Sequence, residues 1–149
     1  MVEAYIFDDR DEVDFREPHN SGEAVTLEYL AELGVIYKFL ENQDEVDSLA
    51  AARDYKNRDV VNISPLTFQN DEDALLAKLN VFYQEHIHED EEIRYCLDGE
   101  GYFDIRDSRL DRWVRVKVTN GDLLIVPAGI YHRFTLTTQN YIKAMRLFK

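Results

Sequence analysis

The spacing of apolar residues changes partway along the chain, from a helical period to a strand-like one. In the earlier part, a first helix is predicted over residues 26–33, because Gly34 is a common type of residue just beyond a helix end. A second helix is predicted over residues 42–53, and a third begins from a cap at Asn70. The short β-prone run at residues 59–63 predicts one strand between them.

The later part of the chain is predicted to form strands, because short apolar segments are separated by turn residues. The predicted strands are residues 93–97, 102–105, 113–118, 123–126, 131–137 and 141–148. The Asp98-Gly99-Glu100-Gly101 sequence between the first two is typical of a hairpin turn. Many short strands at this spacing favour an antiparallel sandwich or barrel of the jelly-roll type.

The predicted fold class is therefore mainly β with α. We expect a single domain over residues 1–149, with a helical N-terminal part (1–85) layered on a jelly-roll β-barrel (86–149). A chain of 149 residues has the length of one ordinary domain, and 45% hydrophobic residues are enough for a packed core.

Net charge and cysteine content bear on the partners and the cellular compartment of the protein. The net charge of -13 would repel nucleic-acid backbones and anionic membrane surfaces, so neither is expected as a partner. No apolar stretch approaches the ~18 residues that span a bilayer, and the N-terminus does not resemble a secretory signal. Cys96 is the single cysteine, which excludes an intramolecular disulfide and suits the cytosol.

Candidate metal ligands lie in the barrel part. His86 and His88 are two residues apart, so on a strand both point to one face, where Glu92 and the distant His132 could join them. Three imidazoles and one carboxylate suit Fe(II), Ni(II), Mn(II) or Co(II), with two positions left for substrate or water. A His-x-His pair alone is more often coincidence than a ligand pair. The fourth histidine, His19, is expected on the surface.

The spacing of these residues is the stronger signal. His-x-His-x3-Glu-x6-Gly runs from His86 to Gly99, and Gly-x5-Pro-x-Gly-x2-His runs from Gly121 to His132, which match the two cupin motifs. Two positions depart from the motifs without being ligands: Asn80 and Leu136.

Longer stretches resemble the acireductone dioxygenase family of cupins. They are FYQEHIHEDEEIRYCLDGEGYFDIRD and PAGIYHRFTLTTQNYIKAMRLF, with EIRY and GIYHRFT more specific than generic cupins. The stretches MVEAYIFDD, LGVIYKFL and YKNRDVVNIS resemble eukaryotic members, so the resemblance covers essentially the whole chain. Family members usually continue past MRLF with pocket-covering residues, and this chain stops at Lys149.

The resemblance implies a reaction and its cofactor. The family cleaves an acireductone, 1,2-dihydroxy-3-keto-5-methylthiopentene, with O2 to 4-methylthio-2-oxobutanoate and formate in methionine salvage. The nickel form gives methylthiopropionate, formate and carbon monoxide instead. We therefore expect one Fe(2+) or Ni(2+) per chain. We also expect a monomer that acts on a small molecule and O2 in the cytosol, with the nucleus as a second compartment.

Four further residues are candidates for the substrate pocket. Arg94 lies two beyond Glu92, so on a strand it faces the metal side and could stabilise negative charge on substrate oxygens. Its alternative role is a surface salt bridge with neighbouring acids. Arg146 is a second candidate inward charge on the last strand. Phe82 and Phe134 could wall the pocket against water, or could be ordinary core residues.

Two alternative functions stay open at this point. One is another metal-dependent cupin oxidase, of the oxalate-oxidising or flavonol-cleaving kind, which would share the ligands but lack the EIRY and IYHRFT contexts. The other is a non-catalytic cupin that binds a small molecule, and the complete ligand set argues against it.

Overall fold

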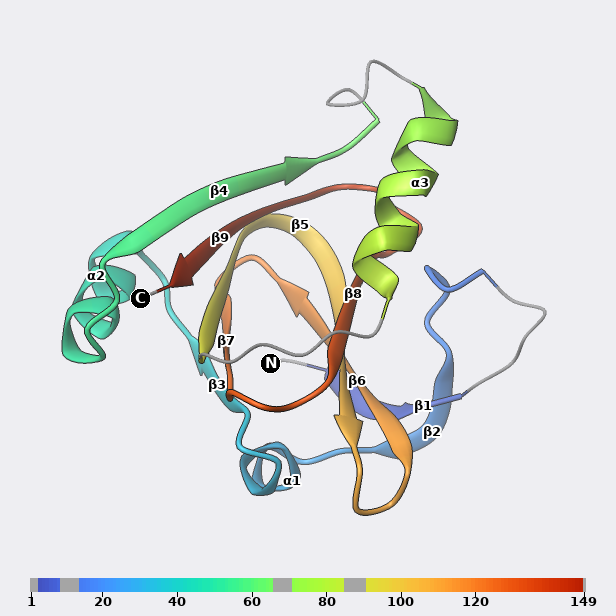
Figure 1. Ribbon diagram of the computed structural model, residues 1–149, viewed down its shortest axis with the longest axis horizontal. Helices are drawn as coiled ribbons and strands as arrows, with labels where there is room; N and C mark the ends of the chain where they lie inside the picture. Colours follow the sequence, from blue (N-terminus) through green and yellow to red (C-terminus); the bar gives the residue numbers. More distant parts are fainter. Residues whose placement is uncertain (1–2, 9–13, 66–70, 85–90, 149) are drawn as a thin grey trace.

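The computed structural model describes residues 3–8, 14–65, 71–84 and 91–148. Its elements are arranged around a curled sheet (Figure 1). The helices are α1 (Leu27–Glu32), α2 (Gln43–Ala52) and α3 (Glu72–Tyr83). The strands are β1 (Glu3–Phe7), β2 (Asn20–Ala24), β3 (Ile36–Phe39), β4 (Asn57–Ile63), β5 (Glu92–Asp107), β6 (Arg112–Thr119), β7 (Asp122–Val126), β8 (His132–Leu136) and β9 (Ile142–Phe148).

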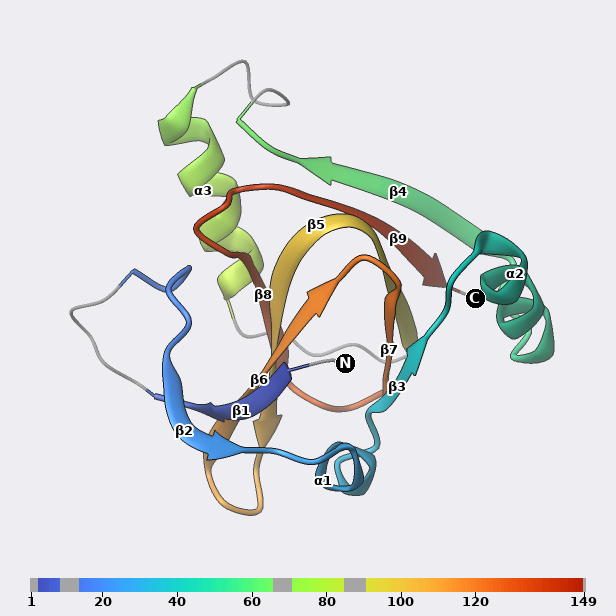
Figure 2. The same cartoon turned by 180° about the vertical axis from the view of Figure 1, so that it is seen from behind.

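All strand pairs are antiparallel, and they form two sheets that share β5. One sheet runs β2-β1-β6-β5-β8, and the other runs β3-β7-β5-β9-β4. Seen from behind, β1 and β2 form an outer margin of the first sheet, while β4 and β9 lie side by side in the second (Figure 2). The mainly β fold predicted from the sequence is confirmed.

The predicted hairpin at residues 98–101 is wrong, because β5 is one continuous strand of 16 residues. It pairs first with β7 and β9, then bends and pairs with β6 and β8. The bend coincides with a bulge, since Cys96 pairs with Ala144 whereas Asp98 already pairs with Lys143, leaving Leu97 as the extra residue. Glycine residues there accommodate a change of direction in a strand as readily as a turn.

The first half of the chain holds more strand than its pattern predicted. The three predicted helices are present, but four strands accompany them, and each pairs within the two sheets. The sequence does not predict β2, because its residues NSGEA are exposed along the whole strand and show no apolar alternation. The cap of α3 is Asp71, not Asn70: the Asp71 carboxylate accepts from the Ala74 N–H at 3.1 Å. Asn70 itself lies outside the described residues.

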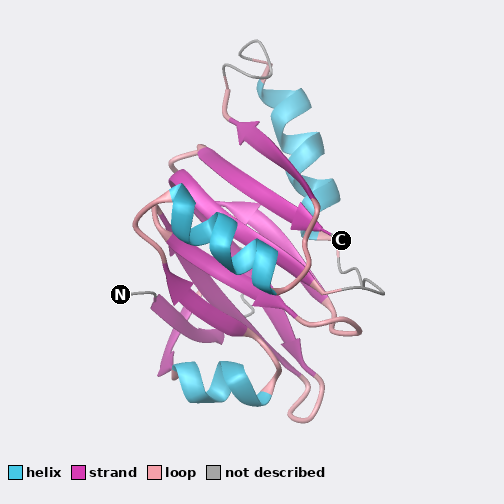
Figure 3. Ribbon diagram, turned by 90° about the vertical axis from the view of Figure 1, so that its left-hand side faces the viewer, coloured by secondary structure: helices cyan, strands magenta, loops and turns pink. Residues whose placement is uncertain are grey.

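The helices lie around the strands (Figure 3). α3 packs on β8 and buries Leu75 and Leu79 in a core that includes Ile105. α2 buries Val46 and Ala50 in a second core against β5, β7 and β9. Among the described residues, no helix is long and apolar enough to cross a membrane.

A buried charged group lies on the face of the first sheet opposite to the face that carries Ile105. Asp104, Arg115 and Arg133 form it, and we call it the outer arginine cluster. Asp104 on β5 lies between Arg115 on β6 and Arg133 on β8 in register. Asp104 accepts from Arg115 Nε at 2.8 Å and Nη2 at 3.0 Å, and from Arg133 Nε at 2.8 Å. The side chains of Asp104 and Arg115 are 1% and 0% exposed.

The segment around Phe15 and Glu17, which precedes β2, covers this cluster. Arg115 Nη1 donates to the carbonyls of Phe15 and Glu17 at 3.0 and 2.8 Å. The Cζ atom of Arg133 lies 4.1 Å from the ring centroid of Tyr83, at the end of α3, and 4.1 Å from the ring centroid of Trp113. The cluster therefore joins the N-terminal segment and the end of α3 to the sheet.

Candidate active site

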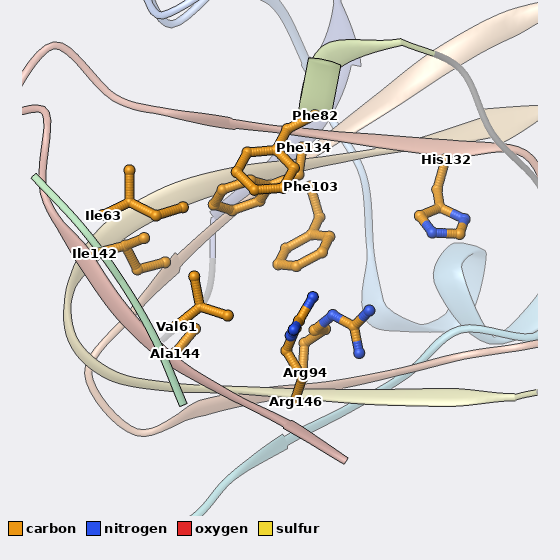
Figure 4. Close-up of a pocket in the computed structure, with 10 residues that line it drawn as sticks. All are labelled: Val61, Ile63, Phe82, Arg94, Phe103, His132, Phe134, Ile142, Ala144 and Arg146. Carbon is orange, nitrogen blue, oxygen red and sulfur yellow. The ribbon is translucent and has the colours of Figure 1, made fainter. Parts of the chain in front are cut away.

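A cavity of about 200 Å³ lies inside the curled sheet, where β4, β5, β8 and β9 face one another (Figure 4). Its wall has three kinds of side chain. The aliphatic ones are Val61, Ile63, Ile142 and Ala144, the aromatic ones are Phe82, Phe103 and Phe134, and the polar ones are Arg94, Arg146 and His132. The aliphatic group and His132 lie on opposite sides of the cavity, with the two arginines between them (Figure 4). The cavity is therefore apolar at one end and charged at the other.

Glu92 and His132 meet at the charged end. Glu92 opens β5 and His132 opens β8, and Glu92 Oε2 lies 3.9 Å from His132 Nε2. Both side chains are mostly buried, at 14% and 5% exposure. The other ring nitrogen, His132 Nδ1, lies 3.2 Å from the carbonyl oxygen of Ile130, which can fix the tautomer that leaves Nε2 without a proton. A carboxylate beside such an imidazole has the donor chemistry of a divalent transition-metal site.

The other two predicted ligands, His86 and His88, fall in residues 85–90 and lie outside the described residues. No group of three or more potential metal-binding side chains occurs in the described part of the chain. The described residues on either side of this range are nevertheless at the cavity: Phe82 in the last turn of α3 lines it, and Glu92 begins β5 beside His132.

Arg94 lies on the cavity side of β5, as the two-residue spacing from Glu92 predicted. Its Nη2 donates to Glu92 Oε2 at 2.8 Å, so an ion pair with a neighbouring acid does form. That pair is not a surface one, because the two side chains are only 17% and 14% exposed. Burial lowers the pKa of Arg94, while the carboxylate of Glu92 opposes that change. Arg94 therefore presents a desolvated guanidinium beside Glu92.

Arg146 lines the same cavity from β9, directly across from Arg94 in the strand register. Its guanidinium is held by Asp59 on β4 through two contacts, of 2.8 Å and 2.5 Å. The hydrogen bonds from Arg146 lower the pKa of Asp59. Asp59 was predicted only as part of a strand, because its place opposite Arg146 depends on how β4 and β9 pair, which a local pattern does not contain.

The predicted aromatic residues both line the cavity and pack on the core, so the two alternative roles coexist. The rings of Phe82 and Phe134 meet edge to face, with centroids 6.0 Å apart. Phe103, which was not singled out from the sequence, packs on Phe134 with centroids 4.9 Å apart. The three rings form one side of the cavity (Figure 4). Phe103 is an odd number of residues from Arg94, so an alternation counted from Arg94 gives no sign that Phe103 also faces the cavity.

His19 is not the surface residue that was predicted, because it is only 7% exposed. Its ring stacks on Phe7 with centroids 4.7 Å apart, and its two nitrogens lie 2.8 and 2.9 Å from the carbonyl oxygens of Asp8 and Asp14. It joins Asp8, just after β1, to Asp14, before β2, at a place outside the cavity. The polar sequence around it gave no sign of this, because its partners are main-chain groups.

Comparisons with known proteins identify the family of this chain. The model of the ARD/ARD′ family matches residues 3–149. The chain is 59% identical to the acireductone dioxygenase of Saccharomyces cerevisiae, over 100% of this chain and 83% of that one. It is 58% identical to that of Candida albicans, over 100% and 84%. The solved structure of an acireductone dioxygenase from Bacillus anthracis, with a cadmium ion in its active centre, superposes with a TM-score of 0.74 at 25% identity, covering 99% of this chain and 92% of that one.

Proposed function

We infer that this chain, which belongs to the ARD/ARD′ family, is a metal-dependent dioxygenase that cleaves an acireductone with O2. The proposed substrate is 1,2-dihydroxy-3-keto-5-methylthiopentene, and the proposed products are 4-methylthio-2-oxobutanoate and formate. The observation that carries this proposal is the pair of Glu92 and His132 at the charged end of a cavity whose far end is apolar.

The two ends of the cavity suit the two ends of this substrate. Its enediol head becomes anionic when it ionises, and its methylthioethyl tail is apolar. The head suits the end that carries Arg94, Arg146 and His132, where the guanidinium of Arg94 is largely removed from water. The tail suits the aliphatic side chains of β4 and β9.

His86, His88, Glu92 and His132 would together hold one divalent ion, Fe(2+) or Ni(2+), which when bound favours an anionic bidentate ligand and lowers the cost of ionising it. Glu92 is kept in place by its hydrogen bond from Arg94. The remaining guanidinium N–H groups of Arg94 can donate to substrate oxygens as negative charge develops on them.

Other residues control the surroundings of the head. Each of the two arginines is paired with a carboxylate, but Arg146 is 39% exposed and Arg94 only 17%, so water screens the charge of Arg146 more strongly. Phe82, Phe103 and Phe134 cover the cavity on the side of α3 and limit the access of water. Exclusion of water strengthens the electrostatic interactions inside the site and protects a reactive substrate from side reactions.

We propose in addition that the bound metal decides which carbon–carbon bonds break. Three imidazoles and a carboxylate do not choose sharply between iron and nickel, so either should load in nearly the same fold. Iron is expected to give the 2-oxo acid and formate. Nickel is expected to give methylthiopropionate, formate and carbon monoxide, so that one further carbon leaves as gas from the same two substrates.

One apo preparation, split and reloaded with each metal, tests this proposal. Both halves receive the same acireductone and O2, and the acids and the gas are analysed. The expected result is the 2-oxo acid from the iron half and carbon monoxide from the nickel half. Identical products from two fully loaded halves would refute the metal-dependent branching alone. No oxygen uptake with either metal would refute the proposed activity, and uptake with oxalate or a flavonol instead would favour another cupin oxidase.

A further inference from the structure

Gly101 differs from the other glycines of this protein. Five of the six glycines have a positive φ, which favours glycine for reasons of backbone conformation. Gly101 does not: it lies in extended backbone within β5, paired with Val118 on one side and Leu136 on the other. It also lies outside the metal-binding motif, which ends at Gly99. Because glycine weakens the interior of a strand, its presence here calls for a reason in the packing.

The reason lies in the two side chains that cover it. A Cβ atom at Gly101 would lie 2.8 and 3.0 Å from Cε1 and Cζ of Phe134, and 3.1 Å from Cδ1 of Ile142. Atoms in proteins do not pack as closely as 2.8 Å without hydrogen bonding, so at least the phenyl ring would have to move. Phe134 and Ile142 both line the cavity. Gly101 itself does not line it, because they lie between it and the open space.

The direction of that movement is restricted by the packing. Gly101 and Phe103 lie two residues apart on β5, so both face the inside of the sheet. The ring of Phe134 is bounded by the rings of Phe82 and Phe103, and Ile142 is only 1% exposed. A side chain at position 101 would therefore push Phe134 and Ile142 towards the cavity, at its apolar end (Figure 4).

We propose that Gly101 sets the depth of the apolar end of the cavity and thereby selects acireductones by the length of their tail. This inference rests on the proposed function. With glycine at this position, Phe134 and Ile142 can lie back against β5 and leave room for an unbranched tail of the size of methylthioethyl. Gly101 is thus a specificity-determining residue that touches neither the metal ligands nor the cavity arginines, Arg94 and Arg146.

The test compares the wild type with Gly101→Ala on two acireductones, one with the methylthioethyl tail and one whose tail is a single methyl group. For the long-tailed substrate, kcat/KM should fall on the order of tenfold, mainly through KM, because one methylene-sized misfit in an apolar pocket has about this effect. For the methyl substrate, kcat/KM should change less than twofold. An equal fall for both substrates, or no fall for either, would overturn the proposal.

A double variant supplies the matched control. Gly101→Ala with Ile142→Val lacks the Cδ1 atom that lies 3.1 Å from the new methyl group, so part of the lost preference for the long tail should return. No recovery in a folded protein with full metal content would count against the mechanism. If Gly101→Ala does not fold, Ile142→Val alone decides: it should raise the relative kcat/KM for a hexyl tail several-fold, and an unchanged ratio would overturn the proposal.

Binding of unreactive acids separates this inference from the proposed function. Pyruvate and 2-oxohexanoate share a head and differ in tail length, and their affinity for the metal-loaded protein can be measured by calorimetry. Gly101→Ala should weaken 2-oxohexanoate on the order of tenfold and leave pyruvate within twofold. If the wild type consumes no acireductone but shows this pattern, the proposed activity fails and the role of Gly101 stands. Equal weakening of both acids would overturn that role.

Discussion

The protein places two pairs of arginines on the opposite sides of its sheets, and their surroundings differ. The cavity arginines, Arg94 and Arg146, each have one carboxylate partner and border an open space of about 200 Å³. In the outer arginine cluster, Arg115 and Arg133 share the single carboxylate of Asp104 beneath aromatic rings and main-chain carbonyls. The cavity guanidinium groups border open space where a ligand can bind, whereas those of the outer arginine cluster hold segments of the chain together, although Arg133 Nη2 is buried there without a hydrogen-bond partner among the described residues.

The two groups differ in how many partners surround each guanidinium. Arg115 has hydrogen bonds to Asp104 and two carbonyls, and it stacks near Phe7 and Tyr102 at 4.6 and 4.4 Å. The guanidinium of Arg94 donates hydrogen bonds to Glu92 at 2.8 Å and to the carbonyl oxygen of Ile93 at 3.3 Å. Unused donors on a largely buried guanidinium are what an anionic ligand requires.

Removing the shared carboxylate should have the largest effect. Asp104→Asn would leave two buried guanidinium groups side by side without a counter-charge, which costs about 3–5 kcal/mol of stability when a buried pair is broken. Urea unfolding followed by circular dichroism measures the free energy of unfolding. The turnover of the fraction that stays folded should change little. A loss no larger than that of an exposed ion pair would show that the cluster does not hold the fold.

The reverse pattern is expected at the cavity. Arg94→Ala should keep its fold and its metal but lower kcat by a factor that corresponds to about 2–4 kcal/mol of barrier, by analogy with the loss of an oxyanion donor. Steady-state kinetics and metal analysis of the same preparation check this. Arg94→Lys is the matched control, since it keeps the charge and loses the planar set of donors. A wild-type kcat in Arg94→Ala would remove this residue from the mechanism.

A smaller effect is expected at the partner of the second cavity arginine. Asp59 and Arg146 are 43% and 39% exposed, so Asp59→Asn should cost at most about 1 kcal/mol of stability, as for other exposed pairs. The same change frees the charge of Arg146 towards the cavity and should tighten the binding of a 2-oxo acid on the order of threefold. Weaker binding in this variant would mean that Asp59 positions Arg146 for the ligand and does not compete with it.

The smallest effect is expected at Cys96, which lies on β5 between the two groups of arginines. Burial raises the pKa of its thiol to about 12, and the side chain is 2% exposed. Because the thiolate is the reactive form, the native protein should not react with a thiol reagent at pH 8, while the urea-unfolded chain reacts fully. Rapid reaction of the native thiol would show that this part of β5 opens readily.

The sequence was most informative where local spacing decides geometry. The interval between Glu92 and Arg94 placed both on the cavity side of a strand, and the cupin spacing brought the distant His132 to the same end. His86 and His88 remain predictions, since they lie outside the described residues. The helices predicted over residues 26–33 and 42–53 likewise begin at the positions where the structure has their N-caps, Thr26 and Asn42.

Features that depend on long-range pairing could not be read in this way. Asp104 lies at a polar position between the apolar Phe103 and Ile105, which is the pattern of a strand with one face in water. That face is buried because the segment around Phe15 and Glu17 and the end of α3 cross it, and no local pattern records such a cover. The pairing of Asp59 with Arg146 and the burial of His19 were missed for the same reason.

The extra residue at Leu97 has a consequence for parity. In an unbroken strand, side chains two apart share a face, so Arg94 and Phe103, which are nine apart, would face opposite ways. The bulge adds one residue and reverses the alternation, and both side chains line the same cavity. Deleting Leu97 would shift the register of β5, so that the side chains of either its first or its second part would move to the opposite face of the sheet. The cavity therefore depends on the one-residue bulge in β5. Deleting Leu97 should reduce stability and activity far more than any substitution at the same position.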